Sequence, residues 1–368
     1  MPSAPAVHRI FNFSAGPAVL PLPVLEEAQR DLLALPGVGM SVLEISHRSK
    51  PFEEICSGAV ADLRRLAGVP DDYAVLFLQG GATLQFSMVP MNLLPADGTA
   101  DYIETGAWSK KAIVEAKKVG GVHVAGSSKA TNHDRIPDAS ELSFSEAPAY
   151  VHMTSNNTIF GTQYHALPEV PDGAPLVNDA SSDIFCRPLD VTRYGLIYAG
   201  AQKNLSIAGL TVVIVRRDLL ARAPEELPTY LRYAVHAEND SLYNTPPAFG
   251  IYVLRLVLRH LLETGGLEAV AERNERKAGK LYAAIDGSDG YYRGHARAGA
   301  RSWMNVTFRL PSEELEKRFV AEAQAEGLDG LKGHRSVGGI RASIYNAFPE
   351  AGVDALVAFM AEFRRRNG

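Results

Sequence analysis

The sequence predicts an α/β protein whose central sheet is largely parallel. Between residues 73 and 216, short apolar runs alternate with segments of helical periodicity, and several runs are apolar on both faces, as buried parallel strands are. From about residue 247 the pattern changes to two long helices, followed by strands that alternate with helices. We therefore expect a larger α/β domain and a smaller α+β domain.

The composition is that of an ordinary globular chain. The 368 residues carry a net charge of −5 and are 46% hydrophobic and 21% charged. This mild acidity gives no electrostatic case for binding nucleic acid or an anionic membrane. Cys56 and Cys186 are too few for a disulfide framework or a cysteine metal site, and no stretch is apolar enough to span a membrane. We expect a cytoplasmic protein without a metal.

The individual elements follow from the periodicity. Residues 52–66 have apolar side chains at helical spacing, and Gly68 ends this helix. The next elements are expected at 73–79 (strand), 84–94 (helix), 100–106 (strand) and 109–119 (helix), with further strands in VHVAGS, YVHMTS, APLVND, YGLIYAG and LTVVIVRR. Two helices at 246–266 and 267–287 lead to strands at 301–311 and 338–348 and helices at 312–327 and 353–366. We place the large domain at 17–260 and the small domain at 261–368, together with residues 1–16.

Lys203 lies in a turn of small residues between two apolar runs. Its neighbours Ala199, Gly200 and Ala201 let the backbone pack tightly beside its amine. Most lysines are solvated surface residues, but a desolvated lysine has a lowered pKa and can form a Schiff base with a carbonyl group. The motif alone leaves a surface lysine and a catalytic lysine open.

Asp179 ends an apolar run 24 residues before Lys203. An aspartate in this position is more often a turn former or a helix cap. Here, however, a carboxylate and a lysine would follow neighbouring strands and meet at the carboxyl edge of the sheet, where open α/β sheets bind ligands. A Schiff-base lysine with a carboxylate for a pyridinium nitrogen is what pyridoxal phosphate requires.

A glycine turn follows the run at 73–79. Gly80 and Gly81 allow close backbone approach, and the amides of Ala82 and Thr83 would open a helix, which is a ready phosphate site. An ordinary tight turn between a strand and a helix would have a similar sequence. The more specific phosphate-binding motifs, Walker A and GxGxxG, are both missing.

Two cationic segments stand out. ISHRSK contains His47 and Arg48, and GHRSVGGIRAS contains His334, Arg335 and Arg341. Such pairs are usually solvated charge. The glycines of the second segment indicate constrained backbone, and a charge on an apolar strand is costly without an anion. Arginine side chains suit carboxylates and phosphates.

Taken together, these motifs resemble the phosphoserine aminotransferases, a family within the class V aminotransferases. The resemblance extends from about Phe11 to the C-terminus and rests on FNFSAGPAVLP, SHRSKPF, GGATLQF, GAWSKKAIVEAKK, RYGLIYAGAQKN, YNTPP and LKGHRSVGGIRASIYNA. It implies the type I fold of pyridoxal-phosphate-dependent transferases, with a mostly parallel seven-stranded sheet in the large domain and a smaller α+β C-terminal domain. It also implies a homodimer with active sites at the subunit interface.

By this resemblance, Lys203 carries the cofactor pyridoxal 5'-phosphate and Asp179 pairs with its pyridine nitrogen. Trp108 is expected to stack on the cofactor ring, although alone it would more often be a core aromatic residue. Thr158 is expected to bind the phenolic oxygen of the cofactor. Its phosphate is expected to be held by Ala82, Thr83 and Gln202, with Asn244 and Thr245 of the partner subunit.

The resemblance also implies the substrates, L-glutamate and 3-phosphohydroxypyruvate, which give 2-oxoglutarate and O-phospho-L-serine in serine biosynthesis. Arg341 is expected to bind the substrate α-carboxylate, and the distal phosphate or carboxylate to lie among His47, Arg48, His334 and Arg335, with the last two coming from the other subunit. Whether 4-phosphohydroxythreonine of pyridoxine biosynthesis is also a substrate stays open.

Some relatives differ at two places: they have arginine at the position of Thr83, and Pro-Asn-Glu where this chain has residues 155–157, Ser-Asn-Asn. Neither difference touches the reacting atoms, but both bear on cofactor affinity.

Three other functions are compatible with parts of the pattern. An alanine–glyoxylate or serine–glyoxylate aminotransferase would have a similar cofactor site, but its substrates lack a distal dianion for the His-Arg cluster. A cysteine desulfurase would need a catalytic cysteine on a mobile loop, which neither Cys56 nor Cys186 provides. A non-catalytic cofactor-binding regulator would need an appended binding module, and the sequence contains none.

Overall fold

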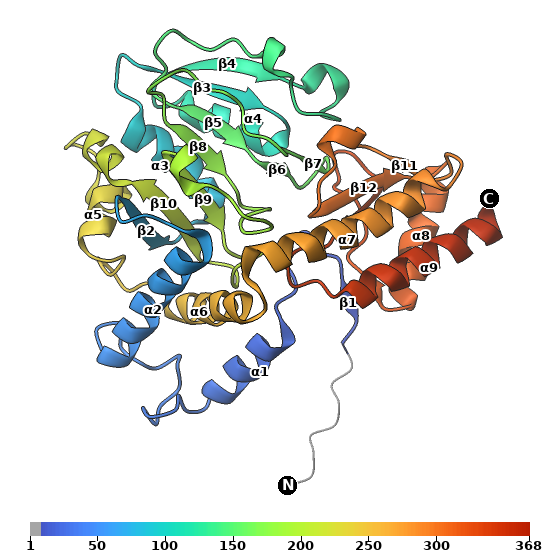
Figure 1. Cartoon of the computed structure of the whole chain (residues 1–368), viewed down its shortest axis with the longest axis horizontal. Coiled ribbons are helices and arrows are strands. Elements are labelled where there is room, and N and C mark those ends of the chain that lie inside the picture. Colours follow the sequence, from blue (N-terminus) through green and yellow to red (C-terminus); the bar gives the residue numbers. More distant parts are fainter. Residues whose placement is uncertain (1–8) are drawn as a thin grey trace.

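A seven-stranded sheet forms the centre of the larger part of the molecule (Figure 1). In this computed structural model, which describes residues 9–368, the strand order is β2-β10-β9-β8-β5-β3-β4. The strands are β2 (Tyr73–Leu78), β3 (Thr99–Glu104), β4 (Gly121–Ser127), β5 (Val151–Thr154), β8 (Leu176–Asp179), β9 (Leu196–Gly200) and β10 (Thr211–Arg216).

Strand directions make this sheet mostly parallel. The pairs β3–β4, β3–β5, β5–β8 and β8–β9 are parallel, whereas β10 runs antiparallel to both β9 and β2. The prediction of a mostly parallel seven-stranded sheet is therefore confirmed. Because β8 and β9 are parallel neighbours, their carboxyl ends meet at the same edge of the sheet.

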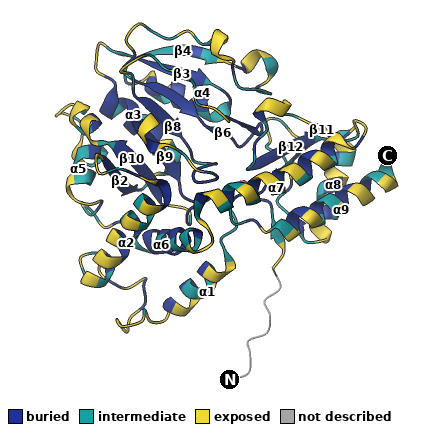
Figure 2. Cartoon of the chain, viewed as in Figure 1, coloured by how far each residue is buried: buried dark blue, intermediate teal, exposed yellow. Residues whose placement is uncertain are grey.

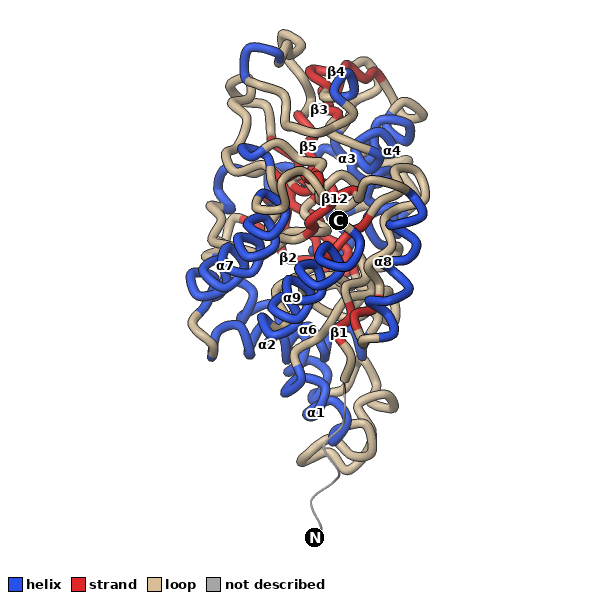
Figure 3. Tube along the Cα trace, turned by 90° about the vertical axis from the view of Figure 1, so that its right-hand side faces the viewer, coloured by secondary structure: helices blue, strands red, loops and turns tan. Residues whose placement is uncertain are grey.

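Helices cover both faces of the sheet, and the strand side chains alternate between them. On β10, Val212 and Ile214 pack with α1 (Leu22–Asp31), α2 (Lys50–Ala67) and α6 (Ala248–Glu263). Val213 and Val215 pack on the other face with α3 (Gly81–Leu93), α4 (Ala107–Ala116) and α5 (Tyr233–Glu238). Figure 2 shows the buried strands between helices with exposed outer faces, and Figure 3 shows the same molecule from the side. The strands can therefore be apolar on both faces.

The smaller part of the molecule is built on an antiparallel sheet. Its strands β11 (Arg293–Gly294), β12 (Asn305–Arg309) and β14 (Ile340–Ser343) pack with α7 (Gly266–Asp286), α8 (Glu313–Ala325) and α9 (Glu350–Asn367). Phe319 lies at the centre, with edge-to-face contacts to Phe308, Phe359 and Phe363. Near the N-terminus, β1 (Phe11–Asn12) pairs with β13 (Leu328–Asp329). Of the helices within residues 9–368, none is long and apolar enough to cross a membrane.

The predicted elements are all present, with shifts at their ends. The helix expected at 52–66 spans 50–67 and ends at Gly68 in a left-handed conformation. The helices expected to begin at residues 84 and 109 begin earlier, at Gly81 and Ala107. The glycine just before each helix, Gly80 or Gly106, has a positive φ, which a pattern of apolar residues does not reveal. The pattern did not reveal α1, whose proline lies in the first turn, where helices tolerate it.

We propose that the two domains divide where the two hydrophobic cores divide. The predicted boundary at residue 260 lies in the last turn of α6. Helix α7 contributes Leu267 and Val270 to the core of the large sheet, and Leu281 and Ile285 to the core of the small one. Of the N-terminal segment assigned to the small domain, residues 1–8 lie outside the described residues.

Packing of α6 against the large sheet predicts a strong effect of truncating Leu254, whose side chain is fully buried in that core. We expect Leu254→Ala to lower the free energy of unfolding by about 2–5 kcal/mol, because a cavity remains where the side chain packed. Urea denaturation followed by circular dichroism measures this. Val114→Ala, at an exposed position of α4, is the matched control with a change below about 0.5 kcal/mol. Equal effects of the two substitutions would contradict this packing.

Candidate active site

Asp179 and Lys203 lie at the carboxyl ends of β8 and β9. Asp179 is the last residue of β8, and Lys203 is the third residue after the end of β9. The register pairs Asp179 with Tyr198 on β9, so that the two strand ends are in line. The two side chains lie close enough for their charges to interact, as predicted. The charge of Asp179 raises the pKa of Lys203, and the charge of Lys203 lowers the pKa of Asp179.

The amine of Lys203 is held by one hydroxyl group. Its Nζ donates a hydrogen bond of 2.8 Å to Oγ1 of Thr158. Burial lowers the pKa of Lys203 from its usual value to about 8, Asp179 opposes this, and the charge of Arg341 lowers it further. A lysine with such a pKa is partly neutral near neutral pH, which is the form that attacks carbonyl carbons and accepts protons.

Asp179 is a buried carboxylate, with only 4% of its surface exposed. Burial raises its pKa, and hydrogen bonds from Ser181, whose backbone N–H lies 3.0 Å from Oδ1, oppose that rise. A buried carboxylate of this kind is suited to a partner that brings its own N–H and positive charge.

Thr158 is carried by a short hairpin that reaches from the large sheet to the small domain. Strands β6 (Asn156–Asn157) and β7 (Thr162–Gln163) form this hairpin. Asn156 donates to Oδ1 of Asn305 on β12 over 2.8 Å, and Thr307 donates to the carbonyl of Phe160 over 2.9 Å. The acceptor of the Lys203 amine is therefore fixed by both domains.

The hairpin includes one of the positions at which this chain differs from some relatives. Ser155 donates from Oγ to a carboxylate oxygen of Asp183, and Asn157 donates to Oγ1 of Thr105 over 2.8 Å. These bonds hold the base of the hairpin without a proline or a glutamate.

The glycine turn after β2 has the geometry of an anion site. Gly80 and Gly81 have φ values of 86° and 62°, and α3 begins at Gly81. Ala82 and Thr83 lie in the first turn of α3, where backbone N–H groups have no partner within the helix. The side chain of Gln79 donates to the carbonyl of Thr245 over 3.3 Å, which brings the segment of Asn244 and Thr245 to this turn within one chain.

Trp108 and Arg341 each bury a donor that has no partner in the described chain, namely Nε1 of Trp108 and Nε of Arg341. Trp108 lies in the first turn of α4, with the amine of Lys111 4.3 Å from the centre of its ring system. Arg341 lies on β14. Gln202, next to Lys203, accepts at its backbone carbonyl from Ala18 over 2.9 Å. Buried donors without acceptors are rare in folded proteins and indicate a ligand that accepts from them.

His334 and Arg335 lie in the tight loop before β14. A Cβ atom on Gly333 would lie 2.0 Å from the carbonyl oxygen of Gly338, so the loop requires glycine there, as predicted. Burial lowers the pKa of His334, and the positive charges of Arg341, Arg335 and Lys111 lower it further. His334 and Arg341 also line one cavity of about 210 Å³.

His47 and Arg48 lie apart from this group, in the loop before α2. In the part of the chain that the structure describes, neither side chain forms a hydrogen bond or ion pair, and Nε2 of His47 is buried without a partner. Within one chain, neither His47 nor Arg48 is among the residues that line the cavity of His334 and Arg341.

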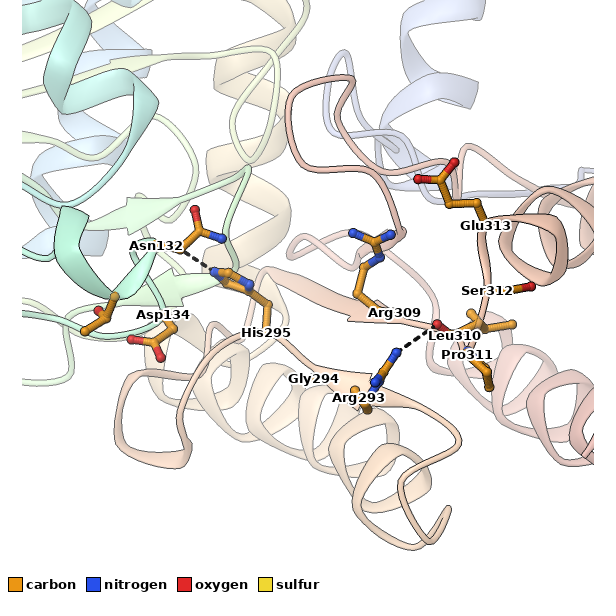
Figure 4. A pocket seen from close by; sticks show the side chains of 11 residues that line it. Asn132, Asp134, Arg293, Gly294, His295, Arg309, Leu310, Pro311, Ser312 and Glu313 are labelled. Carbon is orange, nitrogen blue, oxygen red and sulfur yellow. Dashed lines mark hydrogen bonds between the residues drawn. The ribbon is translucent and has the colours of Figure 1, made fainter.

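A larger cavity of about 560 Å³ lies between the loop at Asn132 and the strands β11 and β12 (Figure 4). There His295 contacts the carbonyl of Asn132, and Arg293 donates to the carbonyl of Leu310. The residues that line it include none of the predicted site residues.

Two residues of the site escaped the sequence analysis. Tyr345 donates to the carbonyl of Ala15 over 2.8 Å and accepts from the side chain of Asn305 over 3.2 Å. Gly16 has a φ of 138°, and a Cβ atom there would lie 3.3 Å from Cγ of Lys203. The motif FNFSAGP and the position of Tyr345 just after β14 were the only signals.

Comparison with known proteins agrees with this geometry. The sequence model of the family described as aminotransferase class-V matches residues 10–356. The chain belongs to the class V aminotransferase family. Members of this family use pyridoxal phosphate, so the predicted cofactor and the predicted type I fold are confirmed.

Several class V aminotransferases resemble this chain over nearly its whole length. The phosphoserine aminotransferase of Herpetosiphon aurantiacus is 56% identical over 98% of this chain and 99% of its own. The structure of phosphoserine aminotransferase from Bacillus circulans subsp. alkalophilus has a TM-score of 0.96 and 53% identity, over 98% and 99% of the chains. The pyridoxal-phosphate-bound enzyme from Trichomonas vaginalis has a TM-score of 0.92 and 39% identity, over 96% and 100%. An alanine–glyoxylate aminotransferase from Nostoc, at 15% identity and a TM-score of 0.74 over 99% and 97%, shares only the fold.

The charge balance around Lys203 predicts a measurable titration. In the cofactor-free protein we expect its amine to titrate near pH 8. In Asp179→Asn we expect a lower pKa, because the negative charge that favours the ammonium form is removed. Competitive acetylation at a series of pH values, read by mass spectrometry of the Lys203 peptide, measures both. A pKa near the usual 10.5, or a rise in the Asp179 variant, would contradict the buried pair.

Proposed function

We propose that this chain catalyses the reaction of phosphoserine aminotransferases, the reversible transfer of the amino group of L-glutamate to 3-phosphohydroxypyruvate. The products are 2-oxoglutarate and O-phospho-L-serine. The observation that carries the proposal is the Lys203 amine, held by Thr158 beside Asp179 and Arg341, in a chain 53–57% identical to phosphoserine aminotransferases over nearly its whole length. The proposal explains why cations are gathered in a chain with a net charge of −5.

The residues at the site fit pyridoxal phosphate. A buried carboxylate, the Thr158 hydroxyl at the Lys203 amine and a glycine turn at a helix N-terminus match its pyridine nitrogen, its phenolic oxygen and its phosphate. Asp179 would pair with the nitrogen, Trp108 would cover the ring and Thr158 would bind the phenolic oxygen. The phosphate would be bound by Ala82, Thr83 and Gln202, with Asn244 and Thr245 of the partner subunit.

When bound, pyridoxal phosphate withdraws the electrons left on the substrate α-carbon after that carbon loses its proton. Lys203 would move this proton: its Nζ would take it from Cα of glutamate and deliver it to C4′ of the cofactor, and in the second half-reaction it would move a proton the opposite way, to Cα of the new amino acid. Burial supports this role, because a pKa of about 8 leaves the amine able both to accept and to donate a proton. Asp179 would pair with the pyridine nitrogen of the cofactor and keep a positive charge on it.

Arg341 would bind the substrate α-carboxylate through its guanidinium group. Its buried Nε, which has no partner in the described chain, supports this role. The distal group differs between the two substrates, since glutamate presents a carboxylate and 3-phosphohydroxypyruvate a phosphate dianion. Histidines suit such a site, because they can gain a proton when the dianion binds. We therefore propose that His47, Arg48, His334 and Arg335 surround the distal group.

We also propose that two copies of the chain form a homodimer. Between α1 and α2, apolar side chains are exposed beside His47, with 88% of Leu33, 45% of Met40 and 61% of Leu43 in contact with solvent. A second copy would cover them and bring the partner's His334 to the loop of His47 and Arg48. We propose that this dimer works in the cytoplasm. Cys56 and Cys186 are both free, which fits a reducing compartment.

The choice of amino donor tests the function. With 2-oxoglutarate as acceptor, we expect O-phospho-L-serine to be used with a kcat/KM at least about 100-fold above that of L-serine or L-alanine, because only it fills the cationic pocket. Coupled glutamate assays measure the rates, and 4-phosphohydroxythreonine can be compared in the same series. Faster use of serine or alanine with glyoxylate would identify a glyoxylate aminotransferase instead, and no activity with any donor would leave a non-catalytic binding protein.

A mixing experiment tests the shared active site. Lys203→Ala and Arg335→Ala are each expected to be inactive or weak as homodimers. In a hybrid dimer, the site built on the wild-type Lys203 receives the wild-type Arg335 from the other chain, so one of its two sites is intact. We expect co-expression with two affinity tags to yield hybrids with about half of the wild-type rate per dimer. Hybrids no more active than the Arg335 variant would mean that Arg335 serves its own chain.

Proton uptake tests the role of His334. Because its pKa is lowered in the free protein, we expect it to be neutral near pH 7.5 and to gain a proton when a phosphate dianion binds. Titration calorimetry of O-phospho-L-serine into Lys203→Ala, in two buffers of different ionisation enthalpy, measures this uptake without turnover. It should vanish in Lys203→Ala/His334→Gln. Equal uptake in both variants would assign the proton to another group.

A further inference from the structure

Helix α7 carries a buried lysine that the proposed reaction does not use. Only 2% of Lys277 is exposed, and its Nζ donates to the carbonyl oxygens of Ile344, Tyr345 and Phe348 over 3.0, 2.7 and 3.2 Å. An ammonium group has three N–H donors, so the three carbonyls satisfy all of them. Within residues 9–368, no carboxylate forms an ion pair with it.

A buried ammonium without a carboxylate partner carries a free-energy cost. Burial lowers the pKa of Lys277 to about 7, the charge of Arg273 lowers it further, and Glu350 on α9 opposes the shift. A methionine of similar size would fill the same space without that cost. Lys277 binds three carbonyl groups of one turn of the chain, which methionine could not do.

That turn, residues 344–348, follows β14 and is linked to the surroundings of Lys203 by two series of hydrogen bonds. In the first, the Tyr345 hydroxyl accepts from Nδ2 of Asn305, and Oδ1 of Asn305 accepts from Asn156 of the hairpin that carries Thr158, the acceptor of the Lys203 amine. Burial raises the pKa of Tyr345 to about 12, so it stays a neutral donor. Its contacts with Ala15 and Asn305, at 2.8 and 3.2 Å, fix the ring from both sides.

In the second series, the backbone N–H of Asn346 donates to Oδ1 of Asn204, the residue after Lys203, over 3.1 Å. Asn274, one turn before Lys277 on α7, donates to Oδ1 of Asn346 over 2.8 Å and to the carbonyl of Cys186 over 2.9 Å. Helix α7 therefore holds the turn with two side chains, Lys277 and Asn274, and the turn itself contacts Asn204, the residue after Lys203.

We propose that Lys277 is a positioning residue: by binding the three carbonyls of the turn at 344–348, and together with Asn274, it sets the orientation of Lys203 through Tyr345–Asn305, which holds the hairpin of Thr158, and through Asn346–Asn204. The expected effect on catalysis rests on the proposed function. The positioning of the turn and of Lys203 does not depend on it.

The test compares Lys277→Met with Lys280→Met. Lys280 lies one turn further along α7 and pairs with Asp354 and Glu350 at the surface, so its loss removes a lysine from the same helix without touching the turn. In Lys277→Met we expect kcat to fall about ten-fold while the KM for glutamate changes less than about two-fold, because the amine is misoriented while Arg341 stays on its strand. Lys280→Met should match the wild type in both.

Two readouts on the cofactor-free protein separate positioning from stability. We expect amide hydrogen exchange in the peptide that contains residues 344–348 to become at least about ten-fold faster in Lys277→Met. We also expect the pKa of Lys203, measured by competitive acetylation, to rise above about 8, because water reaches a loosened amine. If exchange and stability change while kcat and the Lys203 pKa match the wild type, Lys277 is only structural and the proposal is wrong.

Asn274→Ala keeps the test decisive if Lys277→Met does not fold. It removes one contact to the same turn, so we expect changes of the same sign and smaller size, and an unchanged kcat and Lys203 pKa would overturn the proposal. If the wild type has no transaminase activity, the proposed function fails, but hydrogen exchange and acetylation still decide the structural part.

Discussion

The site depends on two parallel neighbouring strands that end at the same edge of the sheet. Because β8 and β9 pair in register, a buried carboxylate and a lysine amine come together although 24 residues separate them in sequence. Both groups are costly to bury alone, and each lowers the cost of the other, as their opposite effects on each other's pKa show. The sheet thus holds a half-buried, reactive amine beside a buried carboxylate.

The surroundings limit how that amine can point. Small residues after β9 and Gly16 allow the backbone to approach the Lys203 stem, and the hairpin that carries Thr158 fixes the nitrogen. Since that hairpin is bonded to β12, the orientation of the amine depends on how the small domain lies against the large one. The same domain carries Arg341, so substrate binding and amine orientation share one support.

The sequence allowed more of the fold than of the site to be predicted. Buried strands and amphipathic helices leave a clear periodic pattern, and the pairing of Asp179 with Lys203 followed from strand order alone. Helix ends were displaced where glycines with positive φ begin a helix, since periodicity does not register backbone conformation. The roles of Trp108, Thr158, Asn244 and the His-Arg pairs came from the resemblance, because nothing in their spacing states which long-range contacts they make. Tyr345 and Lys277 were missed because their partners are mostly backbone carbonyls, which no residue pattern reveals.

The central claim is that one site, built on Lys203 and Asp179, serves both an amino donor and a phosphorylated acceptor in turn. The most direct measurement mixes the cofactor-loaded protein with L-glutamate alone and follows visible absorption and 2-oxoglutarate. We expect about one 2-oxoglutarate per chain with loss of the visible band, and full return of the band with O-phospho-L-serine release when 3-phosphohydroxypyruvate is then added. Release of 2-oxoglutarate only when both substrates are present together, or no release at all, would contradict it.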